Sequence, residues 1–163
     1  MPKDILKRYE KWLDMAMISG PPGLRTIKGF RDEALSGEWK GHRSSRLSIQ
    51  YRVIYRVVAA EQLFQVVSVT AHDYRRSQMS QFRPAKRRTA VSVGESVRII
   101  RELQELSQNQ LAELTGIPQA TISAIENDRV SLGVERAKVL ARALKCHPAV
   151  LVFPGWDAEQ SAA

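Results

Sequence analysis

Arginine, histidine and tyrosine side chains cluster around a β-rich stretch in the N-terminal half of the chain. Arg46 lies just before this stretch and Arg52 lies within it, and His72 and Tyr74 follow it. Histidine and tyrosine can take and deliver protons, and arginine stabilises charge that develops on phosphorus. Cutting RNA without a metal ion needs these groups, because one must accept the 2′-hydroxyl proton and another must protonate the leaving oxygen. The competing interpretation is a solvated sheet surface with a structural histidine.

A helix and an antiparallel sheet are predicted to position these side chains. Apolar residues recur at three- and four-residue spacing over residues 5–16, which predicts an amphipathic helix that stops at Gly20 and the two prolines after it. The period then changes to two, and strands are expected over 46–49, 51–58 and 63–70. Alternation along the second strand places four side chains on one face, Arg52, Ile54, Arg56 and Val58, and four on the other, Tyr51, Val53, Tyr55 and Val57.

The C-terminal half is helical in period. After a first helix that begins near Val93, Ser107 and Gln110 have the spacing of a capping box, which predicts the start of a second helix. Gly116 supplies a tight bend, and Pro118 suits the first turn of a third helix because it lacks an N–H. Core positions are expected at Leu111, Ile117, Ile122 and Ile125, and along the stripe Val134, Ala137, Leu140, Ala141 and Leu144.

The charge of the chain is distributed unevenly between these halves. The sequence has 163 residues and a formal net charge of +8, which favours a polyanionic partner such as nucleic acid. Residues 1–80 carry 14 Lys/Arg against 8 Asp/Glu, whereas residues 91–163 carry 7 against 9. A basic stretch with little apolar content lies between them and predicts a linker. We therefore expect domains at 1–80 and 92–155, a linker at 81–91 and a tail at 156–163.

The single cysteine, Cys146, excludes an internal disulfide and favours a reducing compartment. No secretory signal is found at the N-terminus, and the longest aliphatic run, residues 149–153, is far too short to cross a bilayer. These features predict a cytoplasmic protein without a membrane partner. Cys146 and His147 are adjacent but isolated from other ligand residues, so neither a metal site nor a cofactor is expected.

Three segments of the N-terminal half resemble the RelE/HigB superfamily of bacterial toxins. They are residues 35–43 (LSGEWKGHR), 51–57 (YRVIYRV) and 67–74 (VSVTAHDY). The resemblance implies a small α+β domain that cleaves mRNA on the ribosome without a metal ion. It implies that Arg52 stabilises the scissile phosphate and that His72 is catalytic, together with Arg46 and Tyr74. The candidate RNA-binding residues are Lys40, Arg43 and Arg56.

Two segments of the C-terminal half resemble the helix-turn-helix of Xre/Cro-type repressors. They are residues 107–112 (SQNQLA) and 121–127 (TISAIEN). In such domains the second helix of the pair enters the major groove with its N-terminal residues against base edges. The resemblance implies an all-α, five-helix DNA-binding domain of the antitoxin type. The implied base readers are Gln119, Ala120, Thr121 and Ser123, and the implied phosphate contacts are Gln108, Asn127 and Arg129.

Together the two resemblances predict an α+β chain, with a small antiparallel-sheet domain followed by an all-α domain, and they support three hypotheses of function. In the first, the chain is a fused type II toxin–antitoxin protein. Its C-terminal domain would bind operator DNA as a homodimer, repress its own operon and restrain a domain that cleaves mRNA on the ribosome. In the second, it is a transcription regulator with a catalytically inactive toxin fold used for dimerisation or sensing. In the third, it is a metal-independent endoribonuclease whose helical domain only positions it or binds another protein.

Overall fold

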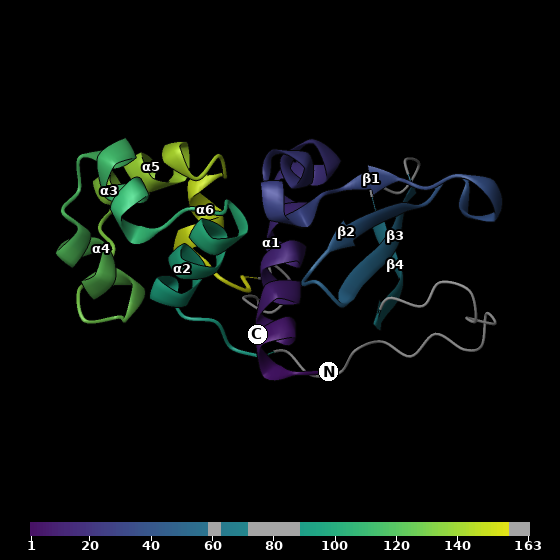
Figure 1. The fold of residues 1–163 in the computed structure, drawn as a ribbon, viewed down its shortest axis with the longest axis horizontal. Helices are drawn as coiled ribbons and strands as arrows, with labels where there is room; N and C mark the ends of the chain where they lie inside the picture. Colours follow the sequence, from purple (N-terminus) through teal and green to yellow (C-terminus); the bar gives the residue numbers. More distant parts are fainter. Residues whose placement is uncertain (59–62, 72–88, 157–163) are drawn as a thin grey trace, which may run out of the picture.

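The computed structural model describes residues 1–58, 63–71 and 89–156. A long helix, α1 (Lys3–Thr26), stands in the middle of the molecule, with a sheet on one side and five helices on the other (Figure 1). The N-terminal part also contains η1 (Lys28–Phe30), β1 (Glu33–Ala34), η2 (Gly37–Trp39), β2 (Arg43–Arg46), β3 (Tyr51–Val58) and β4 (Leu63–Ala71). The helical part contains α2 (Val93–Leu103), α3 (Gln108–Thr115), α4 (Gln119–Glu126), α5 (Val134–Ala143) and α6 (Pro148–Val152). The prediction of a small antiparallel sheet followed by five helices is confirmed. Within the described ranges, no helix is long and apolar enough to cross a membrane.

Helix α1 continues beyond the glycine at which it was predicted to end. Gly20 interrupts the helical backbone with φ 62° and ψ −166°, and a second helical segment then runs to Thr26. Pro21 and Pro22 open this segment, where a missing N–H leaves no intrahelical hydrogen bond unmade. The prediction located the break correctly and was wrong about the end, because the two prolines restart the helix after the kink.

The sheet has the strand order β1-β2-β3-β4 and is antiparallel throughout. Strands β3 and β4 confirm the predicted pair within one residue. The predicted strand at 46–49 is wrong, because β2 ends at Arg46 and a turn follows. In that turn the backbone N–H groups of Leu47 and Ser48 donate to the carbonyl of Tyr51, and the Ser48 hydroxyl accepts from Tyr51 N. Ser48 therefore belongs to a turn.

One face of the sheet packs on α1 through aromatic side chains. Trp12 from α1 meets the ring of Tyr55 edge-on at 5.0 Å between centroids, and Phe64 from β4 stacks on Tyr55. Val53 and Tyr55 share this face by strand alternation and are fully buried. The alternation predicted for β3 therefore places Arg52 on the face of the sheet turned away from α1.

Local signals determine where the C-terminal helices begin. Ser92 and Ser107 each form a complete capping box, with Glu95 and Gln110 respectively. Gly116 ends α3 in the left-handed region at φ 70°, as its predicted bend requires. Pro118 caps α4 from the residue before its first turn, one position earlier than predicted. The predicted stripe on α5 is wrong at its first residue, because the Val134 side chain is 66% exposed while the other four positions are buried.

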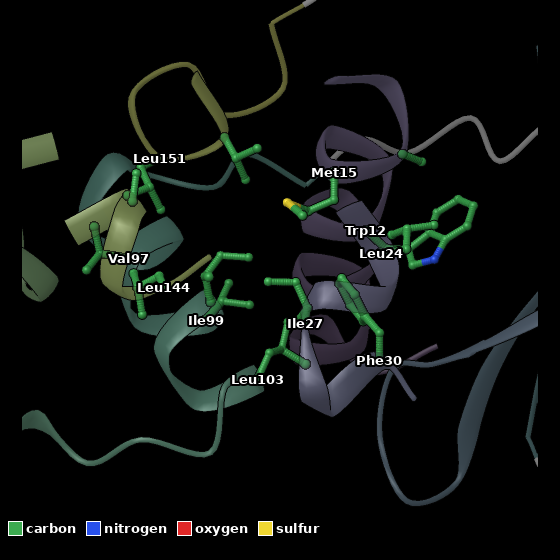
Figure 2. Close-up of a cluster of buried hydrophobic side chains, with 14 of the residues drawn as sticks. Trp12, Met15, Leu24, Ile27, Phe30, Val97, Ile99, Leu103, Leu144 and Leu151 are labelled. Carbon is green, nitrogen blue, oxygen red and sulfur yellow. The ribbon is translucent and has the colours of Figure 1, made fainter. Parts of the chain in front are cut away.

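The apolar core runs without a break from α1 into the helical part. Met15, Leu24 and Ile27 face side chains of α2 and of the segment after α5, including Leu103 and Leu144 (Figure 2). The approach is close enough that a Cβ on Gly29 would lie 2.5 Å from the carbonyl oxygen of Leu103. The two parts of the chain therefore bury one shared core.

The ion pairs between the N-terminal part and the helical part all have the same polarity. Three ion pairs join a cation of the N-terminal part to an acid of the helical part: Lys7 with Glu95, Arg8 with Glu102 at 3.4 Å, and Arg31 with Glu105 at 4.0 Å. The uneven charge noted in the sequence is therefore complementary across the junction. Exposed pairs of this kind contribute little energy each, so their main effect is on orientation and specificity.

Candidate nucleic-acid interface

Helices α3 and α4, joined by the bend at Gly116, present the N-terminal end of α4 to solvent. Gln119 and Ala120 are exposed there, and Thr121 and Ser123, two and four residues after Gln119, are half-buried. On the opposite side of α4, the core contains Ile122 and Ile125, as predicted. The apolar side of α4 therefore packs in the core, and the residues at its N-terminal end remain accessible to solvent. All four predicted base readers lie on this short helix.

A chain of hydrogen bonds connects the tip of α4 to a buried ion pair. Gln119 Nε2 donates to Gln108 Oε1 at 2.6 Å, and Gln108 Nε2 donates to Glu126 Oε2 at 2.8 Å. The Glu126 carboxylate is 2% exposed and also accepts two hydrogen bonds from Arg101, at 2.6 and 3.0 Å. The hydrogen bonds to Glu126 raise the pKa of Arg101 above its ordinary value. The chain ties α2, α3 and α4 together.

The predicted phosphate contacts lie in different environments. Gln108 begins α3 and is held by Glu126 and Gln119. Asn127 follows the last residue of α4 and donates from Nδ2 to the carbonyl of Ser123 at 2.8 Å. Arg129 is exposed in the segment that follows. Arg129 thus offers a charged donor near the C-terminal end of α4, whereas Gln108 and Asn127 offer neutral amides.

On the sheet, the structure brings two of the four predicted catalytic residues together. Arg46 of β2 and Arg52 of β3 are direct cross-strand partners, on the face turned away from α1. Arg52 donates to Glu33 Oε1 at 2.8 Å, and Arg46 Nε is buried without a hydrogen-bond partner among the described residues. His72 and Tyr74, the other two predicted catalytic residues, lie outside the described residues.

The three predicted RNA-binding residues do not gather around this arginine pair. Arg43 points to the α1 side, where it forms two hydrogen bonds to Asp32 and belongs to a buried cluster with Tyr55. Burial and the Asp32 carboxylate raise the pKa of Tyr55, so the phenol stays protonated and donates. Arg56 is exposed toward the other end of β3 and bonds Gln65. Lys40 is exposed after η2.

Comparison with protein families identifies the helical part. Residues 97–151 match the family model described as helix-turn-helix. This part of the chain is a helix-turn-helix domain. The match covers α2 from its fifth residue through α5 and most of α6, and it includes every residue of the hydrogen-bond chain. No match is found among curated proteins.

Two solved structures are similar to part of the chain. The P22 c2 repressor in complex with a synthetic operator is 27% identical over 40% of this chain and 98% of its own length, with a TM-score of 0.38. The restriction-modification controller protein C.AhdI from Aeromonas hydrophila is 30% identical over 37% of this chain and 92% of its own, with a TM-score of 0.36.

Several residues that organise the helix-turn-helix domain were not found by sequence reasoning. Glu126 and Arg101 are 25 positions apart and meet only because α2 packs on the end of α4. Asp128 was also missed: it adopts φ 55° and accepts hydrogen bonds from Gly94 N and the Ser92 hydroxyl at the start of α2. An acidic residue at the last turn of a helix was the available signal, because such a charge opposes the helix dipole unless it is paired.

Proposed function

We propose that this protein is a DNA-binding transcription regulator that reads operator DNA with helix α4. The observation that carries the proposal is the N-terminal end of α4, where Gln119 and Ala120 are exposed while Ile122 and Ile125 anchor the helix in the core. Glutamine can bind adenine through two hydrogen bonds, and a small apolar side chain can meet a thymine methyl group. The helix-turn-helix match over residues 97–151 supports the same assignment.

Accessible cations near α4 support contact with the DNA backbone. The helix-turn-helix half carries a net negative charge, so its contacts to DNA phosphates must come from basic side chains at particular places on its surface. Arg129 lies exposed after α4, and three of the domain's acids, Glu95, Glu102 and Glu105, pair with cations of the N-terminal part. The N-terminal part therefore neutralises acids that would otherwise repel phosphate.

Selection of DNA by the full chain tests this proposal. A library of random double-stranded DNA is enriched on the protein, and the affinity for enriched and scrambled duplexes is measured by fluorescence anisotropy. We expect one enriched sequence, and a palindrome with two protomers per duplex if the protein binds as a homodimer. Gln119→Ala should reduce affinity for the enriched sequence about 10-fold, within the range of one bidentate base contact.

The control variant is Gln50→Ala, which removes an exposed glutamine side chain from the turn after β2, in the sheet-bearing part of the chain. It should bind the enriched duplex as the wild type does. Enrichment of no sequence, or equal affinities of the Gln119→Ala and wild-type proteins, would contradict the proposal.

A second candidate function is the fused toxin–antitoxin protein, favoured by the arginine pair on the sheet. Arg46 lies directly opposite Arg52, and Glu33 pairs with Arg52, whereas the buried Nε of Arg46 has no hydrogen-bond partner among the described residues. An RNA phosphate is an anion that this Nε could bind. The helix-turn-helix domain packs on α1, which covers the other face of the sheet (Figure 1).

Induction of residues 1–80 and of the full chain in bacteria, with mapping of mRNA 5′ ends, tests this second function. A restrained ribonuclease predicts cleavage by the fragment and little by the full chain, with loss of cleavage in Arg52→Ala and His72→Ala. A fragment that is folded by circular dichroism and does not cleave would contradict it. That result would favour a regulator whose toxin-like part is catalytically inactive.

A further inference from the structure

A cavity opens where the N-terminal part of the chain meets the helical part. Its volume is about 380 Å³, which lies within the range of about 300–1,000 Å³ typical of small-molecule sites. The side chains that line it come from η1, from the end of α2 and the turn after it, from α3, and from the end of α5. Both parts of the chain therefore contribute to one concave surface.

Three cations line this cavity. Lys28 belongs to η1, Arg142 to the last turn of α5, and Lys145 follows that helix. All three residues are exposed, and none of them forms an ion pair with a described residue. No acidic side chain of the described part of the chain belongs to the lining. The cavity is therefore a positively charged site.

This concentration of positive charge differs from the rest of the junction. Elsewhere a cation of the N-terminal part meets an acid of the helical part, as in the pairs of Lys7, Arg8 and Arg31. The dipole of α5 favours cations near its C-terminal end, which accounts for Arg142 and Lys145. It does not account for Lys28, which belongs to another element. An anion in the cavity would offset the mutual repulsion of all three charges.

The backbone that carries two of these cations is held in place by Gln104. This side chain is 4% exposed, and its Nε2 donates to the carbonyls of Leu144 at 2.7 Å and Thr26 at 3.2 Å. Its Oε1 accepts from the backbone N–H of Lys28 at 3.4 Å, and the Thr26 hydroxyl donates to the carbonyl of Lys145 at 2.9 Å. The two lysines therefore start from connected backbone segments, and such preorganisation lowers the cost of binding a ligand.

Lys145 occupies a backbone position that favours glycine. Its φ is 54°, in the left-handed region where glycine is the usual residue after a helix. A lysine in this conformation carries a cost in free energy, and residues of this kind are often found where a ligand is held. This cost is consistent with a role for the Lys145 ammonium group in the cavity.

Apolar side chains complete the lining. Leu106, Leu114 and Ala143 contribute to it, and Leu114 is 62% exposed. A nucleic-acid backbone would use the cations of the cavity and leave these apolar groups without a partner. A small molecule with a charged group and an apolar part uses both kinds of side chain.

We propose that this cavity binds a small organic anion, whose carboxylate or phosphate group contacts the three cations and whose apolar part packs on Leu106 and Leu114. Leu114 belongs to α3, so the ligand contacts the helix-turn-helix domain and the N-terminal part at the same time. A ligand that binds only the folded chain should raise its melting temperature. The site does not involve the exposed tip of α4, so the inference does not depend on the proposed reading of DNA.

Calorimetric titration of the full chain with octanoate tests the proposal, because octanoate combines one carboxylate with a short apolar chain. We expect saturable binding of one octanoate per chain. Octanamide keeps the apolar chain without a charge, and acetate keeps the charge without the apolar chain. Each should bind at least about 10-fold more weakly than octanoate. A parallel titration with octyl phosphate shows whether the site prefers a carboxylate or a phosphate group.

Variants of the full chain assign the binding to the cavity. Lys28→Ala and Arg142→Ala should each lower the affinity for octanoate about 10-fold, within the range of one hydrogen bond to a charged group. Lys145→Gly should lower the affinity to a similar extent without lowering the melting temperature, because glycine adopts the left-handed backbone readily. The matched control is Arg136→Ala, which removes an exposed cation of α5 that does not line the cavity. It should bind octanoate as the wild type does.

Three results would overturn the proposal. Equal affinities for octanoate and octanamide would show that the cations do not recognise the ligand. Equal losses of affinity in Arg136→Ala and Arg142→Ala would indicate a diffuse attraction to the positive charge of the chain. Failure of both octanoate and octyl phosphate to bind would also overturn it, and a lower affinity of Lys28→Ala for scrambled duplex DNA would then assign the cations to a nucleic-acid backbone.

Discussion

Lys11 of α1 carries a fully buried ammonium group. Its side chain is 0% exposed, and Nζ donates to Ser96 Oγ at 3.1 Å and to the carbonyl of Val150 at 2.9 Å. Asp14 on the same helix completes the ion pair and also accepts from Gly155 N. Burial lowers the pKa of Lys11, and the Asp14 carboxylate opposes that shift.

Replacement of Lys11 by methionine should therefore destabilise the protein through the acid that it leaves behind. Lys11→Met removes the partner of a buried carboxylate, which typically costs about 3–5 kcal/mol in free energy of unfolding. The double variant Lys11→Met/Asp14→Leu should recover most of this loss, since both charges are then absent. Urea unfolding followed by circular dichroism measures both effects. Equal stability of the single and double variants would contradict this account.

At the residue scale, the sequence predicted exposure better than partners. Local spacing predicted Ile122 and Ile125 as core residues, and both are buried. Gln119 and Ala120, which the resemblance implies as base readers, are exposed at the start of α4, and their role as readers stays a prediction. The contacts of Lys11 with Ser96 and Val150 join residues 85 and 139 positions apart. The periodicity of one helix carries no information about residues so far away in the sequence. Only the folded structure shows which distant polar groups Lys11 contacts.

At the scale of elements, predictions succeeded where a short-range signal exists. The capping box of Ser107 with Gln110 and the bend at Gly116 are each decided within a few residues, and both are confirmed. Strand β2 was misplaced because Arg46-Leu47-Ser48-Ile49 alternates in sequence, while the Ser48 hydroxyl bonds the following backbone and makes a turn. The two-residue strand β1 is too short to show any alternation and exists only through its pairing with β2.

The packing of α2 against α4 gives a prediction at this scale. A Cβ on Gly94 would lie 2.2 Å from the carbonyl oxygen of Ile125 and 2.7 Å from the Asp128 carboxylate, so the two helices would have to separate. We expect Gly94→Ala to lower the free energy of unfolding by about 1–3 kcal/mol, as overpacking does in other cores. Thermal unfolding of the full chain measures this loss.

Gly133 provides the matched control for that substitution. It caps α5 at φ −73°, and a Cβ there meets nothing within 4 Å. Gly133→Ala should therefore change stability by less than about 1 kcal/mol, since alanine replaces glycine at a cap without a steric conflict. Equal losses in the two variants would argue against close packing of α2 on α4 as the cause.

At the scale of the whole molecule, the shared core and the sign of the ion pairs determine how the two parts behave together. The helix-turn-helix domain and the sheet lie on opposite sides of α1, so α1 is common to both packing layers (Figure 1). The mixed fold could be predicted because each half has its own periodicity. The junction could not, since it depends on which apolar faces meet.

This arrangement predicts that the two parts stay associated without a covalent connection. A protease site inserted into residues 72–88 of the full chain would allow cleavage between them. We expect both fragments to elute together in size-exclusion chromatography, because Met15, Leu24 and Ile27 would otherwise expose a buried apolar surface. Elution of two separate folded fragments would contradict the prediction.

Charge reversal refines the same experiment. Glu95→Lys with Glu102→Lys places like charges opposite Lys7 and Arg8, so it should weaken the cleaved complex, most clearly at low ionic strength. Glu113→Lys with Glu135→Lys makes the same change in net charge on exposed residues of α3 and α5. This control should leave the association unchanged.

Cys146, the only cysteine of the chain, lies at this junction within reach of the Lys11 charge, and burial raises the pKa of its thiol to about 12. Only a minute fraction is thiolate at pH 8, so a disulfide reagent should react roughly two to three orders of magnitude more slowly than with an exposed thiol of ordinary pKa. Reaction then waits for transient openings of the junction. The labelling rate of the native protein becomes a direct kinetic measure of how often α1 lifts from the helix-turn-helix domain, and its response to bound DNA would tell whether the two ends of the molecule communicate.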